Sequence, residues 1–257
     1  MYRQTEVASG QGVLSTLANG LAVLEELVGK PSTLRQLAQD VGLPRQTTYR
    51  LIHTLTTLGW VDRNRTDDTY SLSPRLWSLA ARSFDLTDLR GSLAPTVRQL
   101  ADTYGETVHL AVYDRGSVVY VDKQDGSHPI RSYTQLGGRA PAYCVATGKV
   151  LLAHKGPAEW DAVCAVGLVA HTDVTVSDPD RLRAELRGVE RCGYAVNLGE
   201  WRAGVGGVAV PIASATGEVV AALGFSGPSD RIRPQLDTLI AALRDAVGWQ
   251  QHQARVS

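Results

Sequence analysis

The chain is short of the residues that mark several classes of protein. Its 257 residues include three cysteines, one methionine and two phenylalanines. The cysteines, Cys144, Cys164 and Cys192, are odd in number and far apart, so they form no disulfide framework and fit a reducing compartment. An excess of either charge is also missing, because 26 Lys and Arg balance 26 Asp and Glu. A neutral total neither suggests nor excludes a nucleic-acid partner, so local charge decides.

Targeting and membrane signals are missing as well. No basic segment followed by an apolar run stands near the N-terminus, so we expect no signal peptide. No apolar run approaches the length that crosses a membrane. These absences predict a cytoplasmic protein without a membrane partner, and the length allows two modest domains.

The spacings typical of metal sites and active sites are absent too. The histidines and cysteines show neither CxxC nor HExxH, so we expect no metal and no cofactor. Residues 224–227 fall one residue short of a nucleophile elbow, and Gly148-Lys149 lacks the first glycine of a phosphate loop. Cys144 near a helix start could be activated, but a buried structural cysteine is the favoured interpretation. The sequence therefore does not predict an enzyme.

What the first third does contain is a helix-turn-helix pattern. Apolar residues at helical spacing predict a first helix with one apolar face, formed by Val13, Leu17, Leu21, Leu24 and Val28. Thr33 and Gln36 then form a capping box that starts a short second helix, which Gly42 ends. Pro44 suits the first position of a third helix. Two short helices around a glycine-containing turn are typical of DNA-binding domains.

The third helix is expected to have one apolar and one polar side. The apolar side consists of Thr48, Leu51, Ile52, Leu55 and Leu58. The polar side has no acidic residue and carries groups that can read base edges or hold phosphates. These groups are Arg45, Gln46, Thr47, Tyr49, Arg50 and His53. Between residues 31 and 65, five arginines face two aspartates, which is a small basic excess.

A β-hairpin is expected directly after these helices. Residues 60–63 and 70–72 read as short strands around a polar turn at residues 64–69. Arg63 and Arg65 would then lie where a wing follows the DNA backbone or minor groove. An alternative remains open on these features alone, namely a compact three-helix domain with a solvated charged face.

A connector helix is expected to follow. Its apolar residues recur in steps of three and four, as in helices that pack against a partner helix. They are Leu86, Leu89, Leu93, Val97, Leu100 and Tyr104. We expect a break near Gly91 and a new helix beginning at Pro95. The alternative is an ordinary amphipathic helix that lies on its own domain.

The remainder of the chain predicts an antiparallel sheet with helices packed against it. Strands are expected at residues 107–113 and 117–122, around a hairpin turn at 114–116, and again at 194–198, 207–212 and 219–226. Helices are expected at residues 144–154, 157–166, 178–192 and 236–247. Strands first, helices in the middle and strands again indicate an α+β domain.

The motifs, taken in order, resemble the IclR family of bacterial transcriptional regulators. TLRQLA at 33–38 and GLPRQTTYRL at 42–51 resemble that family's helix-turn-helix, and GWV at 59–61 with YSLS at 70–73 resembles its wing. GGRAP at 137–141 and ATGK at 146–149 resemble the opening of its effector domain. The family's order continues with RCGYA at 191–195, with Glu200, and with residues 204–205, 211–212 and 226–228. Gln46 and Thr48 depart from the family pattern, which affects the bases that are read.

This resemblance implies an architecture and a set of partners. The domains would be a winged helix-turn-helix at 12–75, a helical connector at 76–104 and a GAF-like effector domain at 105–257. The partners would be double-stranded operator DNA, which is expected to be palindromic, a small-molecule effector, and further copies of the chain in a homodimer or a dimer of dimers. Whether the effector causes repression or activation is not fixed by the sequence.

The resemblance also implies an effector pocket. Carried over position by position, its lining would be Pro129, Ser132, Ala146, Thr147, Asn197, Gly207, Gly224 and Ser226. The Thr147 N–H near a helix start could hold a carboxylate. Because Gly207 and Gly224 have no side chain, we expect a wider cavity and a larger effector, such as an aromatic acid or amide-like compound. The alternative is that each glycine meets a backbone requirement of its strand.

One alternative function remains at this point. The chain could be a small-molecule-binding protein or enzyme whose N-terminal fold is only an interaction module. The salt dependence of DNA binding distinguishes this hypothesis from that of a regulator. Operator binding weakens steeply with salt yet keeps its sequence preference.

Overall fold

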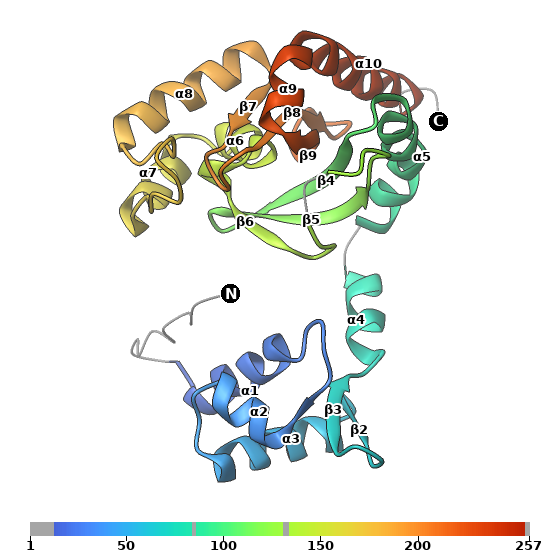
Figure 1. Cartoon of the computed structure of the whole chain (residues 1–257), viewed down its shortest axis with the longest axis vertical. Coiled ribbons are helices and arrows are strands. Elements are labelled where there is room, and N and C mark those ends of the chain that lie inside the picture. The colour runs from blue at the N-terminus through green and yellow to red at the C-terminus, as the bar shows by residue number, and fades with distance from the viewer. Residues whose placement is uncertain (1–12, 84–85, 131–133, 255–257) are drawn as a thin grey trace. The chain divides into compact units, whose positions relative to one another are not determined.

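The computed structural model describes residues 13–83, 86–130 and 134–254, without the side chains of 81–83, 86–88 and 249–254. It divides into two compact units, Met1–Asp85 and Leu86–Ser257, and each is described by itself (Figure 1). In the described residues no helix is long and apolar enough to cross a membrane. The predicted boundaries 12–75, 76–104 and 105–257 stay a prediction.

The first unit combines helices with a small antiparallel sheet. Its helices are α1 (Ser15–Glu26), α2 (Leu34–Asp40), α3 (Arg45–Thr57) and α4 (Arg75–Ser83), and its strands are β1 (Ser32–Thr33), β2 (Val61–Asn64) and β3 (Thr69–Leu72). The strand order is β1-β3-β2. The predicted helix-turn-helix, capping box and hairpin are confirmed, with Pro44 one residue ahead of α3 as its N-cap. The third strand, β1, was not predicted because two residues are too short to show alternation.

The apolar face predicted for α1 is wrong except at Leu24, which packs against the core of the first unit. Leu17 is 62% exposed and Leu21 is 53% exposed, whereas Val23 and Leu27 are buried. Apolar residues surround most of this helix, so their spacing fits more than one face, and packing against α3 selects the side that carries Val23. Leu58, also predicted to be inside, is exposed because it follows the last residue of α3.

The second unit is built on one six-stranded antiparallel sheet with the order β6-β5-β4-β9-β8-β7. The strands are β4 (Thr107–Asp114), β5 (Ser117–Gln124), β6 (Arg139–Pro141), β7 (Ala195–Leu198), β8 (Val205–Ala213) and β9 (Val219–Pro228). The helices are α5 (Leu86–Tyr104), α6 (Ala146–Ala153), α7 (Pro157–Val166), α8 (Pro179–Cys192), α9 (Ser229–Ile232) and α10 (Leu236–Ala254). The predicted α+β arrangement is confirmed. The three-residue β6 and the short α9 lacked a sequence pattern.

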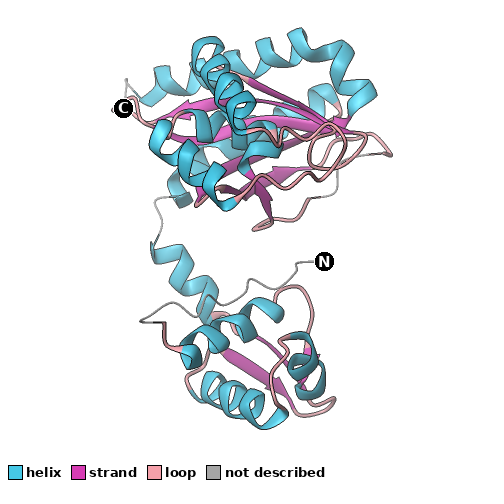
Figure 2. Cartoon of the chain, turned by 90° about the vertical axis from the view of Figure 1, so that its left-hand side faces the viewer, coloured by secondary structure: helices cyan, strands magenta, loops and turns pink. Residues whose placement is uncertain are grey.

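Helices cover both faces of this sheet (Figure 2). The side chains of Val108, Leu110, Val210 and Leu223 pack on one face with the apolar side of α5 and with α10. The side chains of Ala111, Ala209 and Ala222 pack on the other face with α6 and α8. Along β4, β8 and β9, one face thus carries large aliphatic side chains, and the face toward α6 carries mostly small ones. Small side chains let α6 approach the sheet closely.

The predicted break in the connector is wrong, because α5 runs unbroken from Leu86 to Tyr104 with Pro95 inside it. Leu93, Val97 and Leu100 are buried on the sheet of their own unit. Packing of that apolar face stabilises the helix across the one backbone hydrogen bond that proline removes. The alternative of an amphipathic helix on its own domain is therefore the one that the structure supports.

Candidate DNA-binding and effector-binding sites

The helix α3 presents the polar surface that the sequence predicts. Thr48, Leu51 and Ile52 are buried against α1 and α2. The candidate DNA-binding side chains on this helix are all exposed. They are Arg45, Gln46, Thr47, Tyr49 and Arg50. None of these carries an ion pair in the described part of the chain, so the surface is open to a polyanion.

Two contacts fix parts of this surface. The rings of Tyr49 and His53 stack with centroids 5.9 Å apart and planes 8° from parallel. At the other end of the helix, Arg75 donates a hydrogen bond to the carbonyl of Leu58 and lies over the ring of Trp60, 4.6 Å from its centroid. Arg75 therefore caps α3, a role that the sequence did not suggest.

The wing arginines differ from each other. Arg63 donates to Asp68 at 2.6 Å and lies 5.7 Å from the centroid of the Tyr70 ring. Hydrogen bonding to Asp68 raises the pKa of Arg63, which stays charged. Arg65 is exposed in the turn between β2 and β3. Arg63 would have to exchange Asp68 for a phosphate, whereas Arg65 stands at the tip of the wing.

Six of the eight predicted effector residues lie on α6 and on the strands β7, β8 and β9 that it crosses, elements that Figure 1 labels. Asn197, Gly207 and Ser226 are direct partners across β7, β8 and β9. A methyl group at Gly207 would lie 3.8 Å from the Cβ of Ala146, the first residue of α6. The structure thus brings four of the predicted residues together, and Thr147 follows in the same helix turn.

The other three predicted residues have different positions. Gly224 lies in the next row of the sheet, opposite Ala209 and His109. Pro129 is exposed in the segment after β5. Ser132 lies outside the described residues.

Gly207 and Gly224 are explained by a backbone requirement of their strands and not by a wider effector cavity. A Cβ at Gly207 would be 2.9 Å from the carbonyl oxygen of Phe225. A Cβ at Gly224 would be 2.7 Å from the carbonyl oxygen of Val208. Real Cβ atoms do not approach backbone so closely, so both strands require glycine at these positions.

Sequence reasoning missed two polar residues on the same face. Thr107 pairs with Ser226, and His109 pairs with Gly224. Both alternate with the buried Val108 and Leu110, and this pattern of polar residues between apolar ones was the available signal. Burial, and secondarily Lys123, lower the pKa of His109 to about 3, so its ring is neutral. Its Nε2 contacts the hydroxyl of Thr134.

A buried ion cluster holds the start of α6 to its surroundings. The side chain of Lys149 is fully buried, and its Nζ donates to Glu185 at 2.5 Å and to Glu200 at 2.7 Å. Burial raises the pKa of Glu200, which Lys149 opposes. The N–H of Glu200 donates to the Oδ1 of Asn197. One cluster therefore connects α6 and α8 with a predicted effector residue.

Cys144 is a structural residue. It is fully buried next to α6, and burial raises the pKa of its thiol to about 12. A thiol with so high a pKa is a poor nucleophile at neutral pH. This agrees with the favoured interpretation from the sequence.

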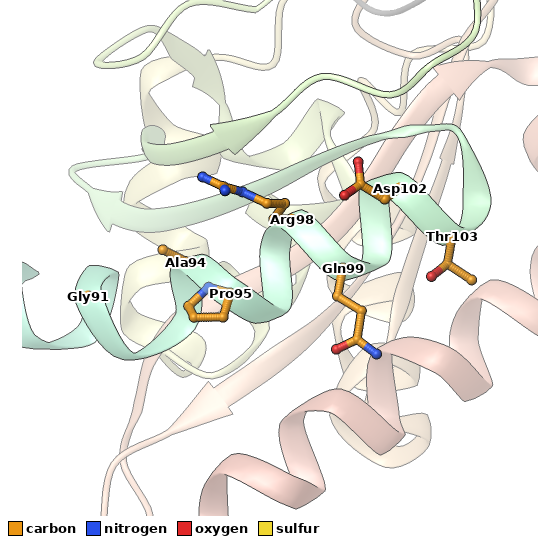
Figure 3. Close-up of a pocket in the computed structure, with 7 residues that line it drawn as sticks. All are labelled: Gly91, Ala94, Pro95, Arg98, Gln99, Asp102 and Thr103. Atoms are coloured by element: carbon orange, nitrogen blue, oxygen red, sulfur yellow. The ribbon is translucent and has the colours of Figure 1, made fainter.

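A hollow on the outer side of α5 lies elsewhere in the second unit. Figure 3 shows Arg98 and Asp102 projecting from one side of this helix and Gln99 from another. The lining is Gly91, Ala94, Pro95, Arg98, Gln99, Asp102 and Thr103. All seven come from one helix and most are exposed. The hollow contains none of the predicted effector residues.

These features define a class of protein. A winged helix-turn-helix with an exposed recognition helix, followed by a sensor-like α+β unit, is the architecture of a DNA-binding transcription regulator. Two family models match the chain, namely the IclR helix-turn-helix domain at residues 16–65 and the bacterial transcriptional regulator IclR C-terminal domain at residues 81–248. The chain belongs to the IclR family, whose members are regulators and not enzymes.

Named relatives cover most of the chain. It is 33% identical over 215 residues to the HTH-type transcriptional regulator KdgR of Escherichia coli K12, covering 83% of this chain and 82% of that one. It is 31% identical over 242 residues to the Pca regulon regulatory protein of Pseudomonas putida, covering 90% and 82%. A solved IclR homologue from Microbacterium hydrocarbonoxydans, in complex with 4-hydroxybenzoate, matches with a TM-score of 0.82 and 29% identity over 95% of this chain and all of that one.

Proposed function

We propose that this regulator binds a palindromic double-stranded operator in the bacterial cytoplasm and that a small-molecule effector in the second unit controls the binding. The observation that carries the proposal is the exposed polar surface of α3, which has arginine, glutamine and threonine side chains and no acidic residue. Arg45, Gln46, Thr47, Tyr49 and Arg50 would enter the major groove, and Arg63 and Arg65 would contact the backbone or minor groove.

The proposed effector is an aromatic carboxylic acid or a related amide. Its carboxylate would lie at the start of α6, where the N-cap residue Val145 makes no side-chain hydrogen bond to the helix. The N–H groups of a first turn favour an anion. The row formed by Asn197, Gly207 and Ser226 would be the floor of this site. Support for an aromatic acid comes from the homologue that holds 4-hydroxybenzoate.

The proposed assembly is a homodimer, with a dimer of dimers as a further step. Its support is a set of large apolar side chains that α1, α4 and the residues before α1 leave exposed. They are Val13, Leu14, Leu17, Leu21, Trp77 and Leu79. Exposed apolar residues on one small unit mark an interaction surface. A second copy of the chain is the fitting partner, because a two-fold dimer doubles the contacts with a palindromic operator.

A gel-shift titration tests operator binding. The probe is the intergenic DNA beside the gene, with scrambled DNA as competitor, at low and moderate salt. We expect binding that resists the competitor and weakens as salt rises, since phosphate contacts release counterions. Loss of the shift to the scrambled competitor at every salt concentration would contradict the proposal. It would favour the small-molecule protein with an N-terminal interaction module.

A further inference from the structure

The wing carries more negative than positive charge, although its arginines are proposed to contact DNA. Residues 61–72 form β2, β3 and the turn between them. They hold two arginines against three aspartates, and two of these aspartates, Asp67 and Asp68, lie in the turn. DNA phosphates repel carboxylates, so each aspartate on this hairpin opposes DNA binding. The contacts of the two turn aspartates show what each of them does.

Asp67 stabilises the turn itself. Its Oδ1 accepts hydrogen bonds from the N–H of Thr69 at 3.1 Å and from the hydroxyl of Thr69 at 2.7 Å. The N–H of Thr66 donates in the same way to the Oδ1 of Asn64 at 3.0 Å. Side chains that accept from the backbone two residues ahead are a common means of stabilising a turn. These contacts hold the turn without Asp68.

Asp68 binds the side chain of Arg63. The Nε and Nη2 of Arg63 both donate to the Oδ1 of Asp68, at 2.9 and 2.6 Å. The φ of Asp68 is 55°, a conformation that glycine and asparagine also adopt readily. Either of these residues would suit the backbone without adding a negative charge. The contact with Arg63 is therefore what the carboxylate contributes.

The part of Arg63 that Asp68 occupies is one that a phosphate uses. Adjacent N–H groups of a guanidinium bind carboxylates and phosphates alike. The strand β2, which carries Arg63, contacts the recognition helix α3. Hydrogen bonding to Asp68 is the main cause of the raised pKa of Arg63, and Tyr49 of α3 is among the smaller causes. Arg63 thus lies near the surface that is proposed to enter the DNA groove.

The contact between Arg63 and Asp68 can be exchanged for a phosphate. The side chain of Arg63 is 50% exposed, and that of Asp68 is 65% exposed. Solvent-exposed ion pairs contribute little to stability, so the two side chains separate readily. When Arg63 leaves to bind a phosphate, Asp68 faces the same polyanion without its cation. The exchange therefore reduces the gain from the new contact.

We propose that Asp68 competes with DNA phosphates for Arg63 and thereby limits the affinity of the protein for DNA. This inference rests on the proposed function and names a residue that regulates binding at the same site. Phosphate contacts carry no sequence information, so Asp68 affects how tightly the protein binds and not which bases it reads. The choice of sequence stays with the side chains of α3.

The test compares Asp68→Asn with Asp67→Asn in the full chain, by fluorescence anisotropy of a labelled operator duplex. Both substitutions remove one negative charge from the same turn and keep an oxygen that accepts hydrogen bonds, but only Asp68→Asn frees Arg63. We expect operator affinity to rise about tenfold in Asp68→Asn and about twofold in Asp67→Asn, because an exposed ion pair accounts for up to about a fivefold difference. Asp68→Gly also suits the positive φ and should match Asp68→Asn.

The gain must also depend on Arg63. In an Arg63→Ala background, Asp68→Asn should raise affinity no more than Asp67→Asn does. A larger gain in that background would overturn the inference. Equal gains of Asp68→Asn and Asp67→Asn in the wild-type background would overturn it too, as would a loss of affinity in Asp68→Asn, which would mean that Asp68 positions Arg63 for DNA. These results leave operator binding intact, whereas wild-type protein that prefers no operator over scrambled DNA contradicts the proposed function itself.

Discussion

Lys149 is a charged residue placed entirely inside the protein. Its ammonium group has exchanged water for two carboxylates, Glu185 and Glu200, at 2.5 and 2.7 Å. Such a cluster adds little stability over apolar packing, but removing one partner leaves uncompensated charge in a buried place. The value of the cluster lies in position, because it holds the first turns of α6 beside Asn197.

Replacing this lysine should therefore destabilise the second unit strongly. We expect Lys149→Met to lower the free energy of unfolding by about 3 kcal/mol, because Glu200 stays buried without its cation. Urea denaturation followed by circular dichroism measures this change. Lys155→Met is the matched control, since Lys155 is exposed just beyond the same helix and should cost little. Equal effects of the two substitutions would contradict the account of the cluster.

His109 makes stability depend on pH. Its pKa is lowered from 6.5 to about 3, so the native state stays neutral while the unfolded state takes up a proton below pH 6.5. The contribution is fully present above pH 6.5 and is lost as pH falls toward 3. Between pH 7 and pH 5 this group should remove about 2 kcal/mol of stability. His109→Gln should flatten that slope in urea melts, and an unchanged slope would show that His109 titrates normally.

At the scale of elements, α3 is the helix that we propose to read DNA. Arg50 lies in the middle of its exposed surface. Arg50→Ala should weaken operator binding by about tenfold and make the plot of log affinity against log salt shallower by about one unit, if Arg50 binds a phosphate. Arg187→Ala on the exposed side of α8 is the control and should change neither quantity. If Arg50→Ala leaves the slope of log affinity against log salt unchanged, Arg50 does not bind a phosphate.

Substitutions in α1 test the proposed homodimer. Leu17 and Leu21 are exposed on the apolar surface that we assign to the dimer. Leu17→Glu with Leu21→Glu should lower the mass measured by light scattering by separating the two copies, because a charge in an apolar interface is costly. Val166→Glu, at a 90% exposed position of the second unit, is the control. If the double variant keeps the mass of the wild type, the dimer interface does not include Leu17 and Leu21.

The sequence predicted most elements because their signals are local. The capping box at Thr33, the hairpin turn at 114–116 and the periodicity of α8 all depend on neighbouring residues. The buried face of α1 and the unbroken α5 could not be predicted, since tertiary packing decided both. The candidate site divides in the same way. The exposed side of α3 follows from one helix, whereas the row from Asn197 to Thr107 depends on the register of four strands.

At the scale of the whole molecule, a net charge of zero is compatible with a regulator that has two tasks, namely binding DNA and binding an effector. The arginines proposed to contact DNA all lie in the first unit, but residues 1–85 as a whole hold nine Lys and Arg against eight Asp and Glu, so the basic groups are gathered on one surface and not in the unit's total charge. Control by an effector requires that the effector bind one arrangement of the protein better than another. The coupling free energy in such systems is about 1–3 kcal/mol, which changes operator affinity by about five- to a hundredfold.

The measurement that tests this account most directly is the affinity of the full chain for its operator with and without effector. Fluorescence anisotropy of a labelled operator duplex gives the Kd at fixed salt in each case. Calorimetry on the same sample establishes that 4-hydroxybenzoate is bound. We predict a change in Kd of at least about fivefold, in either direction, when the effector site is saturated. An identical Kd with the ligand bound would contradict the claim that this site controls DNA binding.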